Sequence, residues 1–274
     1  MTVLDKEGYP VVGLEKSYFT VFDNNKPQEI TFFRGQEDEP ASVGVVFDAS
    51  GSMNPVKIKQ AKNALSRFMR QGHPENDYFL IGFNSTPQLL ADWTRDGQQI
   101  LSIIDYVKGR RETALYDACY LAVEKIMRGG RPRRALLLIS DGQDNLSRFS
   151  FEELKRLLRE SDVPIYSVGI LGGNDPGSSL GMEGQAILRE LSEVGGGDSS
   201  FPSAPRELGM FLEYIAYELR HQYQLGFKPA DTGRDGKWHK IKVKVTLPPG
   251  VAPPDLQIAG ARTREGYYAT KNPR

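Results

Sequence analysis

The sequence has little of several features that would point directly to a function. Its single cysteine, Cys119, excludes any disulfide within the chain, and its position on an apolar helix face favours a core residue over a reactive thiol. Basic and acidic residues balance to a net charge of zero, so no overall basic field favours nucleic acid. No hydrophobic run approaches the roughly 18 residues of a membrane span. Function must therefore be sought in local motifs.

What is present is an ordinary globular composition. The 274 residues are 39% hydrophobic and 26% charged, which suits one large domain with a smaller one beside it. Three arginines, Arg131, Arg133 and Arg134, form a local basic cluster. We expect them to cap a helix end and to lie in a solvated loop.

Both ends of the chain have β patterns. Residues 1–40 contain β-rich runs, with a hairpin signal at Asp23-Asn24-Asn25-Lys26. From residue 223 the pattern is β again, and the run KIKVKVTL alternates apolar residues with lysine or threonine. The run LQIAGARTREGYYA, residues 256–269, is expected to be the last strand. An isolated hairpin is marginally stable. We therefore predict that residues 1–40 and 223–274 pair into one discontinuous all-β sandwich, inside which residues 41–222 are inserted.

The segment 41–222 alternates strands with helices, which indicates a mostly parallel sheet covered on both faces. It is predicted to be an α/β, doubly wound, six-stranded sheet. The predicted strands are 43–47, 78–83, 88–93, 134–140, 164–170 and one near 200. Helices are predicted to begin near 55, 97, 114, 151 and 205, and a further helix carries Ile187, Leu188 and Leu191.

Local signals mark several of these helices. Asn54-Pro55 starts the first helix, whose apolar stripe is Ala61, Leu65, Phe68 and Met69. Ser150 and Glu153 belong to a capping box, and the run Gly195-Gly196-Gly197 ends the helix that carries Ile187.

Polar side chains follow two of the buried strands at the point where each strand ends. Asp48 closes one strand and precedes Ser50 and Ser52, and Asp141 closes another. Thr113 stands at the start of a predicted helix. Because ligands bind beyond the carboxyl ends of strands in open α/β sheets, these side chains converge if the two strands are neighbours.

Every candidate donor in this set is an oxygen atom. Hard cations such as Mg²⁺ and Mn²⁺ prefer oxygen ligands, whereas zinc prefers histidine and cysteine. The histidines, His73, His221 and His239, lie away from these loops in the sequence. An alternative for Asp48 and Ser50 alone is a helix cap after a strand.

The motifs DASGS, the threonine of ETALYDA and the aspartate of SDGQDN resemble the von Willebrand factor type A (VWA) domain and its metal-ion-dependent adhesion site (MIDAS). The order of elements in 41–222 also fits that Rossmann-like domain. The flanking segments, such as DKEGYPVVGLEKSYFTVFDNNKPQEI and DGKWHKIKVKV, resemble the bacterial group of VWFA-related, Acidobacterial-type proteins.

The resemblance implies that Ser50, Ser52 and Thr113 give hydroxyl oxygens directly to Mg²⁺ or Mn²⁺, and that Asp48 and Asp141 act largely through waters. Neutral hydroxyls leave the ion electrophilic, with a free position for the Asp or Glu carboxylate of a protein partner. The implied function is a non-enzymatic adhesion or interaction module. Residues that could support the ligands from behind are Asn84, Glu112 and Asp144.

One departure from related sequences is Arg110-Arg111-Glu112, which stands where a glycine often precedes the threonine. Glu112 could compete for the ion and the arginines could attract an acidic partner, but we favour solvated loop charges.

Two alternative functions stay open. The first is a metal-dependent hydrolase or phosphotransferase, although the sequence lacks the usual motifs of these enzymes, and the second is a structural scaffold.

Relatives of this type are usually exported, so we expect an extracytoplasmic protein whose leader is missing from this chain, with a cytoplasmic location as the alternative. Because the helix at 205–222 runs directly into the strand at Tyr223, we also expect partner binding to shift that helix.

Overall fold

The structure is a computed structural model and describes residues 1–35, 39–107, 112–170, 178–229, 236–248 and 257–269. The chain divides into two compact units. The α/β unit is Glu39–Leu219, and the β unit combines Met1–Asp38 with Arg220–Arg274.

The α/β unit is built on a six-stranded sheet with the order β10-β9-β8-β5-β6-β7. Its strands are β5 (Ser42–Asp48), β6 (Asp77–Phe83), β7 (Pro87–Thr94), β8 (Arg134–Ser140), β9 (Ile165–Gly169) and β10 (Ser199–Ser200). All neighbours pair in parallel except β6 and β7, which are antiparallel. This confirms the predicted doubly wound, mostly parallel sheet.

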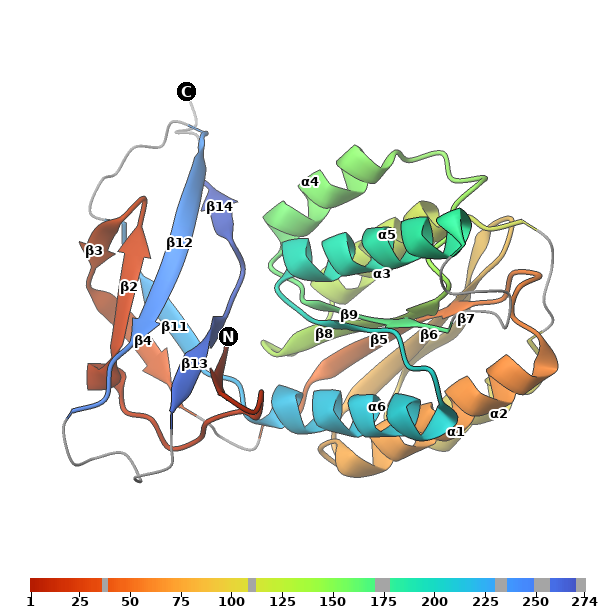
Figure 1. The fold of residues 1–274 in the computed structure, drawn as a ribbon, viewed down its shortest axis with the longest axis horizontal. Helices are drawn as coiled ribbons and strands as arrows, with labels where there is room; N and C mark the ends of the chain where they lie inside the picture. The colour runs from red at the N-terminus through yellow and green to blue at the C-terminus, as the bar shows by residue number, and fades with distance from the viewer. Residues whose placement is uncertain (36–38, 108–111, 171–177, 230–235, 249–256, 270–274) are drawn as a thin grey trace. The chain divides into compact units, whose positions relative to one another are not determined.

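Helices cover both faces of this sheet, as predicted. They are α1 (Pro55–Gln71), α2 (Gly97–Ile104), α3 (Leu115–Met127), α4 (Phe151–Ser161), α5 (Ser179–Gly195) and α6 (Pro205–Arg220). Figure 1 shows α1, α2 and α6 on one face and α3, α4 and α5 on the other. The central strand β5 serves both cores, because Val45 and Phe47 pack with the first group while Val46 packs with the second. Burial on both faces explains why its sequence is continuously apolar.

Helix α1 illustrates how local signals define an element. Asn54 caps it by accepting hydrogen bonds from the backbone N–H groups of Val56 and Lys57, and Pro55 occupies the first helical position. Of its predicted apolar stripe, Ala61, Leu65 and Phe68 are fully buried, and Met69 is partly buried against the same core. Removing a buried phenylalanine side chain typically costs about 3–5 kcal/mol, so this stripe fixes the helix against the sheet.

Two other predicted helix ends are confirmed. Ser150 and Glu153 form the predicted capping box at the start of α4. Helix α5 ends at the glycine run, where Gly196 adopts a left-handed conformation with φ 78°. The predicted helix 205–222 is shorter, because α6 ends at Arg220 and the next strand begins at Gln224. The proposed movement of this helix stays a prediction.

The arginine cluster does not match the sequence-based expectation of a solvated loop. Arg133 is only 2% exposed, and its Nε lies 3.8 Å from Glu39 Oε2. Arg131 donates to Asp77 Oδ2 at 2.8 Å. Arg134 does bind the end of the preceding helix, since its guanidinium donates to the carbonyl of Gly129. The cluster therefore anchors the entry into β8 by long-range ion pairs that local sequence does not encode.

The β unit joins strands from both ends of the chain. Its elements are β1 (Thr2–Asp5), the 3-10 turn Lys16–Tyr18, β2 (Phe19–Asp23), β3 (Lys26–Gln28), β4 (Ile30–Arg34), β11 (Gln224–Phe227), β12 (Trp238–Val245), β13 (Ile258–Arg262) and β14 (Gly266–Tyr268). Three small sheets result, with the orders β1-β13, β11-β4 and β14-β12-β2-β3. Each sheet pairs a strand from the first 34 residues with one after residue 223.

Two details of the β unit bear on the sequence predictions. The hairpin signal is confirmed, because β2 and β3 are joined at Asn24 and Asn25, which both adopt positive φ. The segment 256–269 was expected to be one last strand, but it forms the separate strands β13 and β14, which pair with different partners.

Among the residues that the structure describes, no helix combines the length and the apolar character that a membrane span requires.

Candidate metal centre at the carboxyl edge of the sheet

The two predicted aspartates lie at neighbouring strand ends. Asp48 is the last residue of β5, and Asp141 follows β8, the parallel neighbour of β5. After β5 the chain continues to β6 on one side, and it reaches β8 on the other side only later. The gap between β5 and β8 is therefore the switch point of the sheet, where open α/β sheets place their ligands. Asp48 is fully buried and Asp141 is 7% exposed.

Both carboxylate oxygens of Asp48 already accept hydrogen bonds from the protein. Oδ1 accepts from the backbone N–H of Ser50 at 2.7 Å, and Oδ2 accepts from the hydroxyl of Ser140 at 2.6 Å. The Ser140 hydroxyl is fixed in turn by the backbone N–H of Gly142, which donates to it at 3.0 Å. These contacts hold the carboxylate in one orientation beneath the turn that follows β5.

The hydroxyls of Ser50 and Ser52 lie together in that turn. Their Oγ atoms are 2.9 Å apart, with Ser50 buried and Ser52 exposed. The turn is closed by backbone hydrogen bonds from Met53 to Ser50 and from Asn54 to Ser52. The spacing of the motif thus places one inner and one outer hydroxyl side by side in the turn that follows Asp48.

Thr113 is buried and is held by the loop after β8. Its N–H donates to Asn145 Oδ1 at 2.9 Å, and its carbonyl accepts from the N–H groups of Asn145 and Leu146. The next residue, Ala114, donates to the carbonyl of Asn84 at the end of β6. Within the part of the chain that the structure describes, no hydrogen bond joins the Thr113 hydroxyl to the aspartates or serines.

The three supporting candidates have different positions. The Asn84 carbonyl fixes the start of α3, as described above. Asp144 accepts from the N–H of Tyr116 and from the hydroxyl of Ser147, so it shapes the loop and caps α3. Glu112 is exposed, and its neighbours Arg110 and Arg111 lie outside the described residues.

The electrostatics of this edge favour a cation. Burial, and secondly the nearby Asp141 carboxylate, raise the pKa of Asp48 from 3.8 to about 6, although its hydrogen bonds to Ser140 and Ser50 oppose the shift. Two carboxylates therefore share a poorly solvated site. Lys57, in the first turn of α1, is also close: burial lowers the pKa of its ammonium, and the charges of Asp141 and Asp48 oppose that change.

The donor set fits Mg²⁺ or Mn²⁺. Among the described residues, no group of three or more His, Cys, Asp or Glu is arranged to hold a metal ion, so a ligand set at this edge has to include hydroxyl oxygens. Hydroxyl and carboxylate oxygens are the ligands that these hard cations accept. We call Asp48, Ser50, Ser52, Thr113 and Asp141 the candidate centre.

Sequence reasoning missed Ser140 and Lys57, and it did not foresee the contact of Asn145 with Thr113. Ser140 is a polar residue at the end of an otherwise apolar strand, and Lys57 lies one turn before Ala61 on the buried stripe of α1. Both residues interrupt an apolar pattern, and that interruption could have identified them from the sequence. Nothing local marks Asn145 as the residue that holds Thr113.

The β unit has its own polar features, separate in sequence from the candidate centre. Asp23, which is buried, accepts from the Tyr267 hydroxyl at 2.8 Å and lies 2.8 Å from His239 Nδ1, so it ties together β2, β12 and β14. The mutual pairing of these three side chains indicates a structural role.

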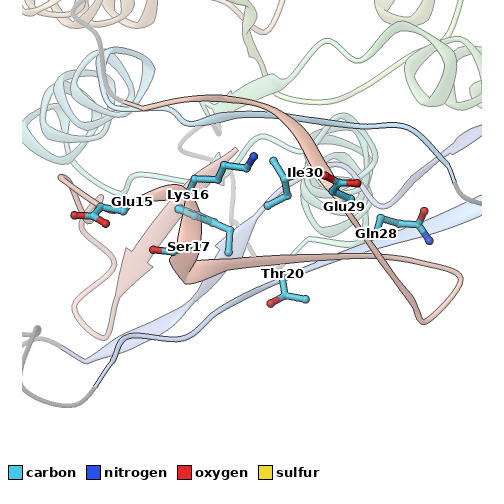
Figure 2. A pocket seen from close by; sticks show the side chains of 8 residues that line it. Glu15, Lys16, Ser17, Thr20, Gln28, Glu29 and Ile30 are labelled. Atoms are coloured by element: carbon cyan, nitrogen blue, oxygen red, sulfur yellow. The ribbon is translucent and has the colours of Figure 1, made fainter.

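The β unit also has a concavity on its surface. Figure 2 shows Lys16 and Ile30 facing its interior and Glu15 and Gln28 at opposite ends.

Comparison with known proteins adds a family and a fold. Residues 42–203 match the sequence profile of the von Willebrand factor type A domain. A protein of Mycolicibacterium paratuberculosis described as "UPF0353 protein" is 26% identical over 232 residues, covering 76% of this chain and 68% of its own length.

Two solved structures share the fold. The von Willebrand factor type A protein from Catenulispora acidiphila superposes with a TM-score of 0.55 at 14% identity, over 74% of this chain, which spans only 50% of that protein. The vWF domain of the type V pili tip protein Mfa5 from Porphyromonas gingivalis gives a TM-score of 0.52 at 14% identity, covering 65% of this chain and 94% of that domain.

Proposed function

This chain belongs to the von Willebrand factor type A domain family, and on that premise we propose that it is a non-enzymatic, metal-dependent protein-binding module. The observation that carries the proposal is the geometry at the switch point. Two buried aspartates end adjacent strands, and a pair of hydroxyls 2.9 Å apart lies in the turn between the first of them and α1.

In this proposal the hydroxyls of Ser50, Ser52 and Thr113 hold Mg²⁺ or Mn²⁺ directly. Asp48 acts from behind them, largely through water, because both of its oxygens are already hydrogen-bonded to Ser50 and Ser140. Asp141 also acts largely through water. When bound, the cation supplies an electrophilic coordination position for the Asp or Glu carboxylate of a partner.

The surroundings of the candidate centre favour a protein as the partner. Leu146 lies shortly after Asp141 in the chain, and its N–H donates to the Thr113 carbonyl. The first part of α5 also lies close to Asp141, since a Cβ added at Gly184 would collide with the Asp141 carbonyl oxygen. These segments and the start of α1 carry large exposed apolar side chains, namely Val56 (64% exposed), Leu146 (45%), Leu180 (55%) and Met182 (56%). Exposed apolar groups beside polar ones are typical of protein interaction sites.

The enzymatic alternative finds less support. Among the described residues, the Ser50 hydroxyl is hydrogen-bonded to Ser52 and no histidine is hydrogen-bonded to it, as a serine nucleophile would need. A nucleophilic aspartate would have to leave the hydrogen bonds that fix Asp48. We therefore keep the binding function as the single proposal.

Calorimetric titration with Mg²⁺ and Mn²⁺ tests the metal centre. We expect the wild type to bind and Asp48→Ala and Thr113→Ala not to bind. Asp92→Ala, which alters an aspartate whose side chain is 70% exposed, is the matched control and should bind like the wild type. Equal binding by all four proteins would contradict the assignment.

A pull-down with and without EDTA tests the partner. We expect acidic partners to be retained only with the metal present, and to be lost from Thr113→Ala at any metal concentration. We also propose an extracytoplasmic place of action, supported by the pilus-tip protein among the structures that share this fold. Recovery of the native protein only in the cytoplasmic fraction of its source would contradict that part.

A further inference from the structure

Lys57 occupies a position that is unfavourable for a lysine on two counts. It lies in the first turn of α1, where its N–H donates to the capping Asn54, and the free N–H groups of a helix start repel positive charge. Its side chain is also buried, with 7% exposure, although lysine is almost never buried without a compensating charge. Such a residue needs nearby negative charges to offset these penalties.

The negative charges that act on Lys57 are the two aspartates of the candidate centre, and they offset the effect of burial in part. Lys57 interacts electrostatically with Asp141 and with Asp48, which are themselves almost fully buried. One turn further along α1, Ala61 and then Leu65 pack into the core under the same sheet. The lysine thus extends this buried face toward the carboxyl edge, where both strands end.

We propose that Lys57 sets the net charge of the candidate centre so that the metal-loaded form favours a carboxylate ligand. This inference rests on the proposed function. Two ionised aspartates and one ammonium leave a single negative charge, and a divalent cation converts it to a single positive charge. A partner carboxylate then neutralises the site. With a neutral residue at position 57, the charges of the dication and of the two aspartates would already sum to zero.

The proposal predicts two effects of opposite sign. Replacing Lys57 by a neutral side chain removes a charge that repels the dication, so metal binding should tighten. The same replacement removes the residual positive charge, so the metal-loaded protein should bind a carboxylate more weakly. Each change should be roughly tenfold, which is the scale of one unit charge acting across a partly buried site.

The experiment compares the wild type, Lys57→Met, Lys57→Arg and Lys59→Met as full chains. Lys59 is an exposed lysine in the same helix and serves as the matched control. Mn²⁺ affinity is measured by calorimetry. Acetate is then titrated into the Mn²⁺-loaded proteins, and its binding is followed by the loss of water-proton relaxation as acetate replaces water on Mn²⁺, with chloride as the salt control.

We expect Lys57→Met to bind Mn²⁺ more tightly and acetate more weakly, whereas Lys57→Arg and Lys59→Met keep both wild-type affinities. If Lys57→Met fails to fold, as judged by its thermal unfolding, Lys57→Gln takes its place with the same expectation. Unchanged or weakened Mn²⁺ binding in the neutral variant, with normal binding by the wild type, would overturn this inference alone. A wild type that binds no Mn²⁺ would overturn the proposed function and this inference together.

Discussion

The hydroxyl of Ser140 donates a 2.6 Å hydrogen bond to Oδ2 of Asp48, joining the ends of the adjacent strands β8 and β5. This contact is buried. It lowers the pKa of the Asp48 carboxyl, whereas burial of that carboxyl raises the pKa by a larger amount. Ser140 therefore helps to keep Asp48 ionised in a poorly solvated site.

Ser140→Ala tests this relationship. The substitution leaves Asp48 Oδ2 without its donor and the N–H of Gly142 without its acceptor, so the free energy of unfolding should fall by about 1–3 kcal/mol. Urea denaturation measures the change. Ser102→Ala removes an exposed hydroxyl and should change stability by less than about 0.5 kcal/mol. Equal effects of the two variants would contradict a special role for Ser140.

The pKa of Asp48 predicts a pH dependence of stability in the metal-free protein. The pKa of Asp48 is about 6 in the folded state, whereas the ordinary value of 3.8 applies in the unfolded state. Between these two pH values the folded state therefore holds a proton that the unfolded state has lost. Stability contributed by this group therefore falls as pH rises through that window, by about 3 kcal/mol in total. Asp48→Asn, which cannot ionise, should lack this loss.

The measurement is chemical denaturation in EDTA at several pH values. Near pH 4, Asp48→Asn and the wild type should be similarly stable, and near pH 7 the variant should be more stable by up to about 3 kcal/mol. Subtracting the two curves removes the contribution of the other carboxylates. A difference that does not change with pH would show that Asp48 titrates normally.

Gly184→Ala tests the packing of α5 against Asp141. A Cβ at this position would collide with the Asp141 carbonyl oxygen, so the helix or the strand end must shift. We expect a loss of about 1–3 kcal/mol in stability and weaker Mg²⁺ binding, measured by denaturation and calorimetry. Gly130→Ala adds its Cβ in open space and is the control. Normal metal binding by Gly184→Ala would indicate that the contact of α5 with the Asp141 carbonyl does not position the metal site.

Tyr267→Phe tests the polar cluster of the β unit. Without the tyrosine hydroxyl, Asp23 Oδ2 loses its donor in a buried position, which should lower the free energy of unfolding by about 1–3 kcal/mol. Metal affinity should not change, because the candidate centre belongs to the α/β unit. Tyr268→Phe, at a residue that is 39% exposed, should be nearly neutral. A loss of metal affinity in Tyr267→Phe would show that the two units are coupled.

Much of the fold could be predicted because it is written in local patterns. The apolar run of β5, the Asn54-Pro55 start of α1 and the capping box of α4 each depend on residues a few positions apart. The division of 256–269 into two strands could not be predicted in this way, because each strand is defined by a distant partner. The same reason explains the burial of Arg133, whose ion-pair partner Glu39 is remote in sequence.

By itself, the sequence determined the order of strands and helices in the α/β unit and the residues that end β5 and β8, because hydrophobic period and capping act over short distances. Only the tertiary structure decided that β5 and β8 are neighbours, that Ser140 binds Asp48 and that Asn145 holds Thr113. It alone also placed Lys57 within the electrostatic reach of both aspartates. These contacts join residues far apart in the chain, and their energy comes from burial and charge, which arise only when the sheet is assembled.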